Sequence, residues 1–300
     1  MADKTYRVLG SGSLGYQLYD LETKEISSHP YRRGKLSYEA KKIIIGDYVF
    51  LDQDGLIADV QERTSFLQRP RLSNVDMIYV LISAKEPDFS SYLLDKFLSL
   101  ITFSSLRSSI VITKADLLKQ RERNALQKRM EMYGKIGFPV YFVDAHQEKE
   151  FDFPKLHASL SGKSAAFAGQ TGVGKSSLLN TLDPEYRRKV DALYVNSGRG
   201  RHTTKEVALL PYQGGFLFDT PGFSDLEFQE MKSDDLALSF PGYEPYYGTC
   251  FFKDCHHLEG AKGCKVIEAV ESGKLSGDSY QNYVKLYQEV KVNDLWKKKL

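Results

Sequence analysis

The segment from Gly169 to Ser176 limits the folds open to this chain more than any other segment. It reads Gly-Gln-Thr-Gly-Val-Gly-Lys-Ser and fits the pattern G-x-x-x-x-G-K-S/T, with an apolar strand expected at Ala165–Ala168 and a helix from Lys175. In this context the backbone N–H groups converge on a phosphate, and the helix N-terminus adds positive potential. Lys175 can reach the β- and γ-phosphates, and Ser176 can ligate Mg²⁺. A glycine turn without a ligand is the alternative interpretation. Nucleotide contacts are predicted for Gly169, Gln170, Thr171, Gly172, Val173, Gly174, Lys175, Ser176 and Ser177.

Two further segments indicate which nucleotide the loop holds. Asp219-Thr220-Pro221-Gly222 has the D-x-x-G form, in which Asp219 positions Mg²⁺ through water and the N–H of Gly222 meets the γ-phosphate. Thr113-Lys114-Ala115-Asp116 has the form N/T-K-x-D that reads guanine in GTPases. A carboxylate at Asp116 accepts hydrogen bonds from guanine N1–H and N2–H₂, a pair of donors that adenine lacks. Lys114 would lie over the base. Together the segments predict a guanine nucleotide site with Mg²⁺.

The order of these segments along the chain indicates a circular permutation. The base-reading segment precedes the phosphate loop here, whereas it follows the loop in ordinary GTPases. The strands of a sheet keep their neighbours when only the chain ends move. Alternating strands and helices predict an α/β layer with a mainly parallel sheet. We expect strands at Val75–Ser83, Ser109–Thr113, Pro139–Val143 and Ala165–Ala168, helices at Ser91–Phe103, Lys119–Tyr133 and Phe153–Leu160, and an edge hairpin of Val207–Leu210 and Phe216–Phe218 across Gly214-Gly215.

The regions on either side of this layer have different patterns. Short apolar runs between glycine turns in the first 70 residues predict a small antiparallel barrel. After Asp234 the alternation stops, and a helix is expected from about Gly277 to Lys299. A chain of 300 residues is long enough for two or three domains. We predict domains at residues 1–70, 71–232 and 233–300.

Composition and charge exclude several classes of protein. With 42% hydrophobic and 27% charged residues, the chain has the balance of a soluble globular protein. Its apolar runs are shorter than the roughly 18 residues of a transmembrane helix, and its N-terminus lacks an apolar leader, so a cytoplasmic protein without membrane contact is expected. The net charge of +2 leaves nucleic-acid contact to local patches. The most basic segment, Arg187–Lys205, is interpreted as a solvated loop or as a switch loop.

The three cysteines gather in one short segment with two histidines. The spacing is Cys250-x4-Cys255-x-His257-x6-Cys264. Three thiolates and one imidazole make a closed tetrahedral site for one structural Zn²⁺, with no position left for an activated water. His256 is the competing ligand, and free cysteines with surface histidines are the alternative without metal.

With these motifs the chain resembles the circularly permuted ribosome small subunit-dependent GTPases, which are ribosome-biogenesis factors of bacteria. The resemblance covers essentially the whole chain and also rests on Arg33-Gly34-Lys35, Gly46-Asp47, Arg69-Pro70 and Gly198–Thr204. It implies an N-terminal OB-fold β-barrel, a circularly permuted P-loop GTPase domain and a C-terminal zinc-binding α-helical domain with His257 as the ligand. Three departures are Thr113 in place of Asn, Asp144-Ala145 in place of Ser-Ala, and Gly172 where potassium-dependent GTPases carry Asn. Potassium activation is therefore not predicted.

The resemblance also implies an activity and partners. The expected function is GTP hydrolysis to GDP and phosphate in late maturation of the 30S ribosomal subunit, stimulated by that subunit. A monomer is expected to bind 16S rRNA through Arg32, Arg33 and Lys35, and an ordinary basic turn is the alternative interpretation of these residues. A nucleotide-gated RNA-binding module without significant turnover is the rival function. A metabolic P-loop kinase is disfavoured because Asp116 and Asp219 fit GTPase motifs.

The catalytic residues follow from switch I and from one substitution. Thr203 or Thr204 lies where a switch I threonine ligates Mg²⁺, and the sequence alone does not choose between them. Phe223 stands after the D-x-x-G segment, where Ras-type enzymes use Gln to hold the attacking water. A phenyl ring cannot polarise water, so slow intrinsic hydrolysis is expected. His202 is the candidate catalytic replacement, acting with Lys175, and a merely polar switch residue is the alternative.

Overall fold

The computed structural model describes residues 5–12, 15–29, 42–144, 151–196, 207–220, 223 and 231–297. The chain divides into two compact units, each built from separate stretches of sequence. The first consists of Met1–Ile78, Pro154–Ala168 and Lys175–Ser224, and the second of Tyr79–Phe153, Gly169–Gly174 and Asp225–Leu300. The domain boundaries after residues 70 and 232 stay predictions. Among the described helices, none has both the length and the apolar character needed to cross a bilayer.

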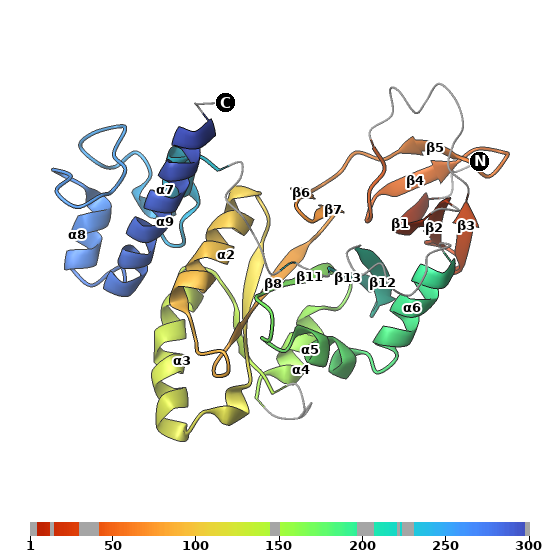
Figure 1. The fold of residues 1–300 in the computed structure, drawn as a ribbon, viewed down its shortest axis with the longest axis horizontal. Helices are drawn as coiled ribbons and strands as arrows, with labels where there is room; N and C mark the ends of the chain where they lie inside the picture. The colour runs from red at the N-terminus through yellow and green to blue at the C-terminus, as the bar shows by residue number, and fades with distance from the viewer. Residues whose placement is uncertain are drawn as a thin grey trace. The chain divides into compact units, whose positions relative to one another are not determined.

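An antiparallel sheet of five strands begins the first unit (Figure 1). Val8 and Leu18 are paired across it and are fully buried, and Val49 lies on the same face. This sheet is the antiparallel β-structure expected for the N-terminal region. Its strands, in the spatial order β3-β2-β1-β4-β5, are β1 (Thr5–Gly12), β2 (Gly15–Asp20), β3 (Ile26–His29), β4 (Tyr48–Leu51) and β5 (Ile57–Val60). A hairpin of β6 (Phe66–Gln68) and β7 (Arg71–Ser73) follows.

Gly46 and Asp47 fix the turn before β4 within the first unit. The φ of Gly46 is +96°, and a Cβ there would lie 2.3 Å from the carbonyl oxygen of Ser73 and 2.9 Å from the ring of Phe218. Only glycine fits this position without a shift of the backbone. Asp47 is buried and accepts two hydrogen bonds from Arg63, at 2.7 and 2.8 Å. Both residues therefore stabilise the fold.

A second sheet of six strands carries the expected α/β layer. β10 is parallel to β9 and β11 is parallel to β13, whereas β12 pairs with β13 in antiparallel fashion at the edge. β9 and β11 are buried along their whole length, as in parallel strands covered on both faces. In the spatial order β10-β9-β8-β11-β13-β12, the strands are Val140–Phe142, Ser108–Thr113, Met77–Ser83, Ser164–Ala168, Gly215–Asp219 and Ala208–Tyr212.

The helices of the layer confirm the alternation, and one turn lies one residue earlier than expected. The helices are α2 (Ser91–Phe103), the 3₁₀ turn η1 (Ala115–Leu117), α3 (Gln120–Lys135), α4 (Phe153–Ser159) and α5 (Lys175–Leu182). The β12–β13 turn is formed by Gln213 and Gly214, because Gly215 already belongs to β13. A Cβ on Gly215 would lie 2.3 Å from the carbonyl oxygen of Lys163, so a glycine lets this strand approach closely.

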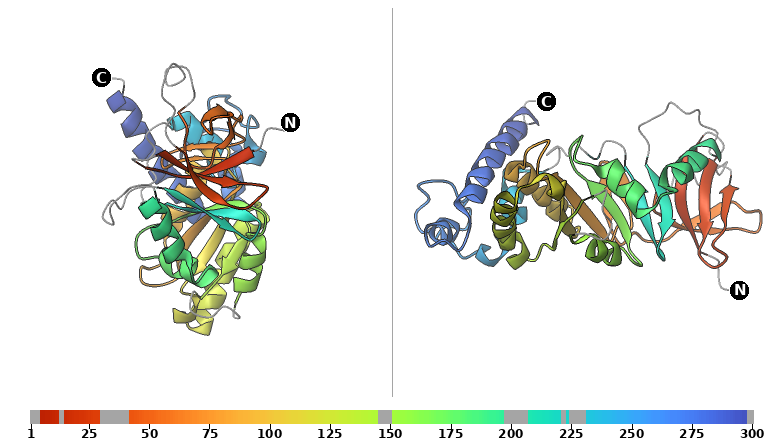
Figure 2. Two further views of the ribbon diagram at one scale, coloured as in Figure 1. Left: turned by 90° about the vertical axis from the view of Figure 1, so that its right-hand side faces the viewer. Right: turned by 90° about the horizontal axis from the view of Figure 1, so that it is seen from below.

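The basic segment after the phosphate loop contains a helix, which corrects the expectation of a loop from Arg187 onward. Helix α6 covers Tyr186–Asn196 and lies beside the N-terminal sheet (Figure 2). Tyr186, Val190 and Leu193 are buried at helical spacing, and this spacing is the signal that identifies the helix. The intervening charges of Arg187, Arg188 and Lys189 obscure it in the sequence.

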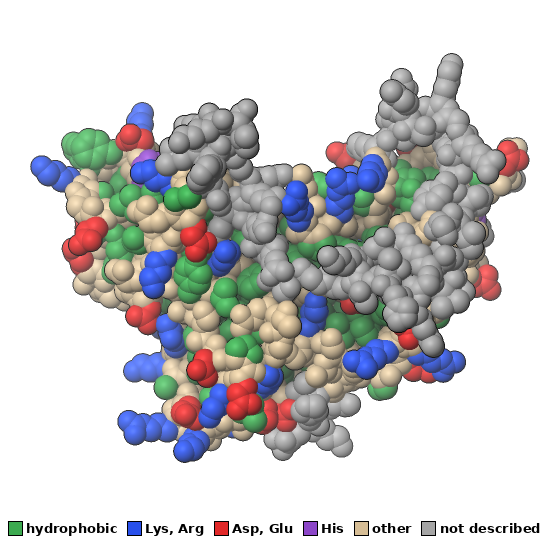
Figure 3. All heavy atoms as spheres, in the orientation of Figure 1, with side chains coloured by type: hydrophobic (Ala, Val, Ile, Leu, Met, Phe, Trp, Pro, Cys, Tyr) green, Lys and Arg blue, Asp and Glu red, His purple; other side chains and the backbone are tan. Residues whose placement is uncertain are grey.

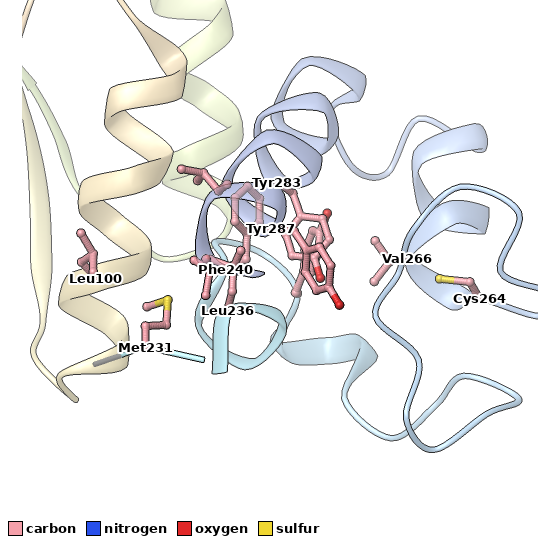
Figure 4. Packing of buried hydrophobic residues seen from close by; sticks show 11 residues of the cluster. Leu100, Met231, Leu236, Phe240, Cys264, Val266, Tyr283 and Tyr287 are labelled. Atoms are coloured by element: carbon pink, nitrogen blue, oxygen red, sulfur yellow. The ribbon is translucent and has the colours of Figure 1, made fainter. Parts of the chain in front are cut away.

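The C-terminal region of the second unit is helical around one apolar cluster. It contains α7 (Ser233–Ser239), the 3₁₀ turn η2 (Glu244–Tyr246), α8 (Lys265–Glu271) and α9 (Gly277–Lys297). Figure 4 shows Leu100 of α2 beside the side chains of this region. The α2 helix therefore shares its core with the cysteine segment. The cluster consists of Leu100, Met231, Leu236, Phe240, Tyr243, Cys264, Val266, Tyr283, Leu286, Tyr287 and Val290.

A buried carboxylate joins three helices of the second unit. Asp95 of α2 is fully buried and accepts hydrogen bonds from the hydroxyl of Tyr133 at 2.7 Å and from the amide of Asn282 at 2.8 Å. The hydroxyl of Ser279 donates a third, at 3.1 Å. Burial raises the pKa of Asp95 to about 6, although these three hydrogen bonds act in the opposite direction. The network fixes α9 to α2 and α3.

Candidate nucleotide site and metal centre

The phosphate loop lies between β11 and α5, as the motif requires. The φ of Gly169 is +156°, and a Cβ there would lie 2.5 Å from the carbonyl oxygen of Leu81, so no other residue fits at the end of β11. Lys175 is the first residue of α5. Ser176 and Ser177 follow in its first turn and are exposed. The strand–loop–helix context that gives the motif its meaning is therefore present.

Lys175 and Asp219 interact within the first unit. The Nζ of Lys175 donates to the carbonyl oxygen of Thr220 at 2.7 Å. Burial lowers the pKa of Lys175, and the charge of Asp219 partly opposes that shift. Burial raises the pKa of Asp219, while the nearby hydroxyl of Tyr186 and the charge of Lys175 favour its ionised form. The predicted phosphate ligand and the predicted magnesium-positioning residue are thus electrostatically coupled.

The base-reading segment contacts the phosphate loop within the second unit. Thr113 is 1% exposed, and its Oγ1 donates to the carbonyl oxygen of Val173 at 2.6 Å. Lys114 adopts a left-handed conformation with a φ of +55°, and its Nζ donates to the backbone oxygen of Glu86. Asp116 follows in η1 with an exposed side chain, so its carboxylate is accessible to a base. Asp144 is buried.

Four residues near the C-terminus form a candidate metal centre. Cys250, Cys255, His257 and Cys264 each offer one ligand atom, and these atoms lie within 4.8 Å of one another. The Nδ1 of His257 lies 3.6 Å from the Sγ of Cys250 and 3.4 Å from the Sγ of Cys264. A tetrahedral Zn²⁺ with Zn–S of about 2.3 Å and Zn–N of about 2.0 Å sets such S···N pairs about 3.5 Å apart. The residues therefore fit Zn²⁺.

The adjacent histidine lies elsewhere. The ring of His256 is 5.4 Å from the ring of Tyr287, and its Nδ1 is 3.4 Å from a carboxylate oxygen of Asp234. The Tyr283 hydroxyl donates to the backbone oxygen of His256 at 2.7 Å, which fixes the chain between the two imidazoles. Burial lowers the pKa of His257, and this favours the neutral imidazole that binds metal. The structure thus brings together the four predicted ligands and excludes His256 from the set.

Comparison with known proteins identifies the family. The sequence model of the RsgA GTPase family matches residues 60–229. The chain belongs to the RsgA GTPase family. It is 38% identical over 262 residues to the small ribosomal subunit biogenesis GTPase RsgA of Shouchella clausii (strain KSM-K16), a match that covers 86% of this chain and 88% of the relative. The protein of that name from Bacillus subtilis (strain 168) is 37% identical over 266 residues, with 86% and 88% covered.

Two solved structures have the same architecture as this chain. The chain is similar to YloQ, described as a circularly permuted GTPase, with a TM-score of 0.79, 32% identity and 96% and 95% of the two chains covered. It is also similar to YjeQ from Thermotoga maritima, with a TM-score of 0.80, 32% identity and 96% and 98% covered. The predicted circular permutation and fold class are confirmed, and membership of the RsgA GTPase family makes the chain a GTPase.

Several predicted site residues lie outside the described part of this RsgA GTPase. They are Arg32, Arg33 and Lys35 of the N-terminal region, His202, Thr203 and Thr204 of switch I, and Gly222 of the D-x-x-G segment. Phe223 is described, and it is 1% exposed. Its ring belongs to the buried core.

Sequence reasoning did not identify three groups at the site. These are the hydroxyl of Tyr186 beside Asp219, the carbonyl of Thr220 that Lys175 contacts, and the carbonyl of Glu86 that Lys114 contacts. The two carbonyls have no side-chain signature that could reveal them. Only the buried position of Tyr186 in the helical pattern of α6 offered a signal.

Proposed function

We propose that this GTPase acts in late maturation of the small ribosomal subunit and that the 30S subunit stimulates its turnover. The observation that carries the proposal is the match to relatives named small ribosomal subunit biogenesis GTPase RsgA over 86% of the chain and 88% of theirs. Single-turnover hydrolysis of GTP, measured with and without saturating 30S subunits, tests it. Equal rates in the two conditions would remove the ribosomal coupling, and 50S subunits serve as the control for unspecific stimulation.

Guanine is the base that the site reads in this proposal. Asp116 accepts from N1–H and N2–H₂ of guanine, and Lys114 covers the base. The exposure of Asp116 in η1 and the hydrogen bond from Thr113 to Val173 support this assignment, since they tie the base-reading segment to the phosphate loop. Residues Gly169–Ser177 contact the phosphates, with Lys175 drawn from Thr220 to the β- and γ-phosphates.

Magnesium accompanies the nucleotide in the proposal. The hydroxyl of Ser176, the carboxylate of Asp219 acting through water, and a switch I hydroxyl at Thr203 or Thr204 are the oxygen donors that Mg²⁺ prefers. When bound, Mg²⁺ neutralises charge that develops on the phosphate oxygens. The N–H of Gly222 meets the γ-phosphate.

Slow intrinsic turnover follows from the residue that succeeds the D-x-x-G segment. Phe223 is buried, and its side chain has no group that could orient water. His202 takes that role in the proposal, and ordering of switch I on the 30S subunit brings its imidazole to the attacking water. Setting such a group in place accelerates a reaction by about 10²–10⁴-fold. His202→Ala should therefore depress 30S-stimulated hydrolysis and leave GTP affinity nearly intact, whereas Lys175→Ala should impair both. A stimulated rate of His202→Ala equal to wild type would remove the catalytic role.

Zinc and RNA complete the proposal. One Zn²⁺ held by Cys250, Cys255, His257 and Cys264 stabilises the C-terminal region. Its four protein ligands leave no open position, and the cysteines pack in the same apolar cluster as Leu100 of α2. Arg32, Arg33 and Lys35 contact 16S rRNA. The protein acts in the cytoplasm as a monomer that exchanges GTP and GDP.

A further inference from the structure

The β6–β7 hairpin presents an aromatic ring among arginines. Its paired residues are Phe66 with Ser73, Leu67 with Leu72, and Gln68 with Arg71. Leu67 and Leu72 are buried, so the alternation of a strand places Phe66, Gln68 and Arg71 on the opposite face. Phe66 is 42% exposed there. Arg69, in the turn between the strands, and Arg71 are both exposed.

Hydrogen bonds hold the two ends of this hairpin in place. Asn74 accepts a hydrogen bond from the N–H of Thr64 at 2.8 Å and donates one to the carbonyl oxygen of Gly46 at 2.9 Å. The Oγ of Ser65 accepts from the N–H of Val75 at 2.7 Å. The bonds between Thr64 and Asn74 and between Ser65 and Val75 join the two ends of the hairpin to each other, and the bond from Asn74 to Gly46 joins the hairpin to the turn before β4. A fixed surface loses little conformational entropy when it binds a partner.

The face is also positively charged. The guanidinium of Arg63 lies 5.5 Å from the centre of the Phe66 ring and is held there by its paired hydrogen bonds to Asp47. Within the described residues, neither Arg69 nor Arg71 forms an ion pair. Figure 3 shows basic side chains gathered in the region of β6 and β7. Two unneutralised guanidinium groups beside an exposed ring favour a polyanion with flat apolar groups.

We propose that the β6–β7 hairpin binds single-stranded or loop RNA, with an unpaired base stacked on Phe66 and neighbouring phosphates on Arg69 and Arg71. An exposed ring has no partner on a phosphate backbone alone or on an acidic peptide, whereas a nucleobase stacks on both phenyl rings and guanidinium planes. The proposal rests on the function proposed above, because a ribosomal subunit supplies such RNA. It adds a second RNA contact to the one expected at Arg32, Arg33 and Lys35.

The test separates the base from the phosphates. The full chain is titrated with a fluorescent oligomer of about 12 adenosines, a length within the range that one OB fold covers, and with an abasic oligomer of equal charge. Phe66→Ala should weaken adenosine binding about tenfold and leave abasic binding unchanged. The double variant Arg69→Ala/Arg71→Ala should weaken both and should lower the slope of log K against log salt by about 1.4, at about 0.7 per phosphate contact.

Matched controls come from the second unit. Phe103 at the end of α2 is 37% exposed, and Arg107 and Arg121 are exposed. Phe103→Ala and Arg107→Ala/Arg121→Ala should bind both oligomers as wild type does. The proposal would be overturned if the hairpin variants bound the adenosine oligomer as wild type does, or if the control variants lost as much affinity as the hairpin variants. The proposal would also be overturned if poly-glutamate displaced the oligomer and Phe66→Ala bound the oligomer as wild type does. That outcome would assign the surface to an acidic protein partner.

A parallel measurement distinguishes failure of this proposal from failure of the proposed function. Hydrolysis by the wild-type protein with and without 30S subunits is measured in parallel. If 30S subunits do not stimulate the wild type but the hairpin variants still bind the oligomer more weakly, the ribosomal role is refuted and the RNA-binding role of the hairpin stands. If 30S subunits stimulate the wild type but the hairpin variants bind the oligomer normally, the ribosomal role stands and the RNA-binding role of the hairpin is refuted. If Phe66→Ala unfolds, as judged by its thermal transition, the conservative variant Phe66→Leu, which keeps bulk and removes the aromatic face, replaces it with the same expected loss.

Discussion

Removal of one hydroxyl tests how the base-reading segment supports the phosphate loop. The Oγ1 of Thr113 donates to the carbonyl oxygen of Val173 at 2.6 Å, and both residues are 1% exposed. Thr113→Val keeps the shape of the side chain and leaves that carbonyl without its donor. An unsatisfied buried polar group costs about 1–3 kcal/mol. If the cost falls on the loop conformation that binds phosphate, nucleotide affinity should decrease by about 5- to 150-fold.

Equilibrium titration with a fluorescent GDP analogue measures this effect. Thr113→Ser retains the donor and is the matched control, so its affinity should stay close to that of wild type. Circular dichroism of each variant separates a local effect on the loop from loss of the fold. The reasoning is refuted if Thr113→Val binds as wild type does, or if Thr113→Ser loses as much affinity as Thr113→Val.

Three further predictions concern pH, metal and base choice. Burial raises the pKa of Asp95 from 3.8 to about 6, so the folded state binds its proton more tightly than the unfolded state does; this stabilisation is complete below about pH 4 and is lost as pH rises through 6. By urea denaturation, the free energy of unfolding of wild type relative to Asp95→Asn should fall by about 3 kcal/mol across that range, and a constant difference would contradict the burial argument. Cys255→Ser should lower the zinc content and the thermal stability of the C-terminal helices while nucleotide binding persists; elemental analysis of wild type below half an equivalent of zinc would count against the metal centre, given the roughly 1:1 stoichiometry of a structural site. Asp116→Asn should weaken GTP binding and partly restore binding to xanthine nucleotides in competition titrations, and a wild type that binds ATP as well as GTP would disprove the guanine assignment.

The elements of the α/β layer were predictable because their patterns are local. β9 is a continuous apolar run, and α2 has apolar residues at helical spacing from Leu94 to Ile101. Both appear in the structure within a residue of the expected bounds. The strand, loop and helix around Gly169–Ser176 were equally accessible, because the loop chemistry depends on residues adjacent in sequence.

Helix α6 shows where local patterns fail. Its basic residues fit a solvated loop, and only the burial of Tyr186, Val190 and Leu193 in the fold distinguishes a helix from that loop. The contacts of Lys114 with Glu86 and of Lys175 with Thr220 could not be predicted from the sequence, for a different reason. Each joins a side chain to a backbone carbonyl at least 28 residues away in the sequence, and every residue carries such a carbonyl.

The metal centre illustrates both what the sequence predicts and what only the fold determines. The number and spacing of the cysteines were enough to infer a Zn²⁺ site of three thiolates and one imidazole, because ligand type sets the metal. Spacing left His256 and His257 as rivals, since they are neighbours in the chain. Neighbouring side chains leave the backbone in different directions, and those directions depend on distant residues. Here Tyr283 fixes the carbonyl of His256, whose ring lies against Tyr287, and the Nδ1 of His257 reaches Cys250 and Cys264. The folded chain packs α9 against the cysteine segment, and this packing determines that His257, rather than the neighbouring His256, lies beside the cysteines.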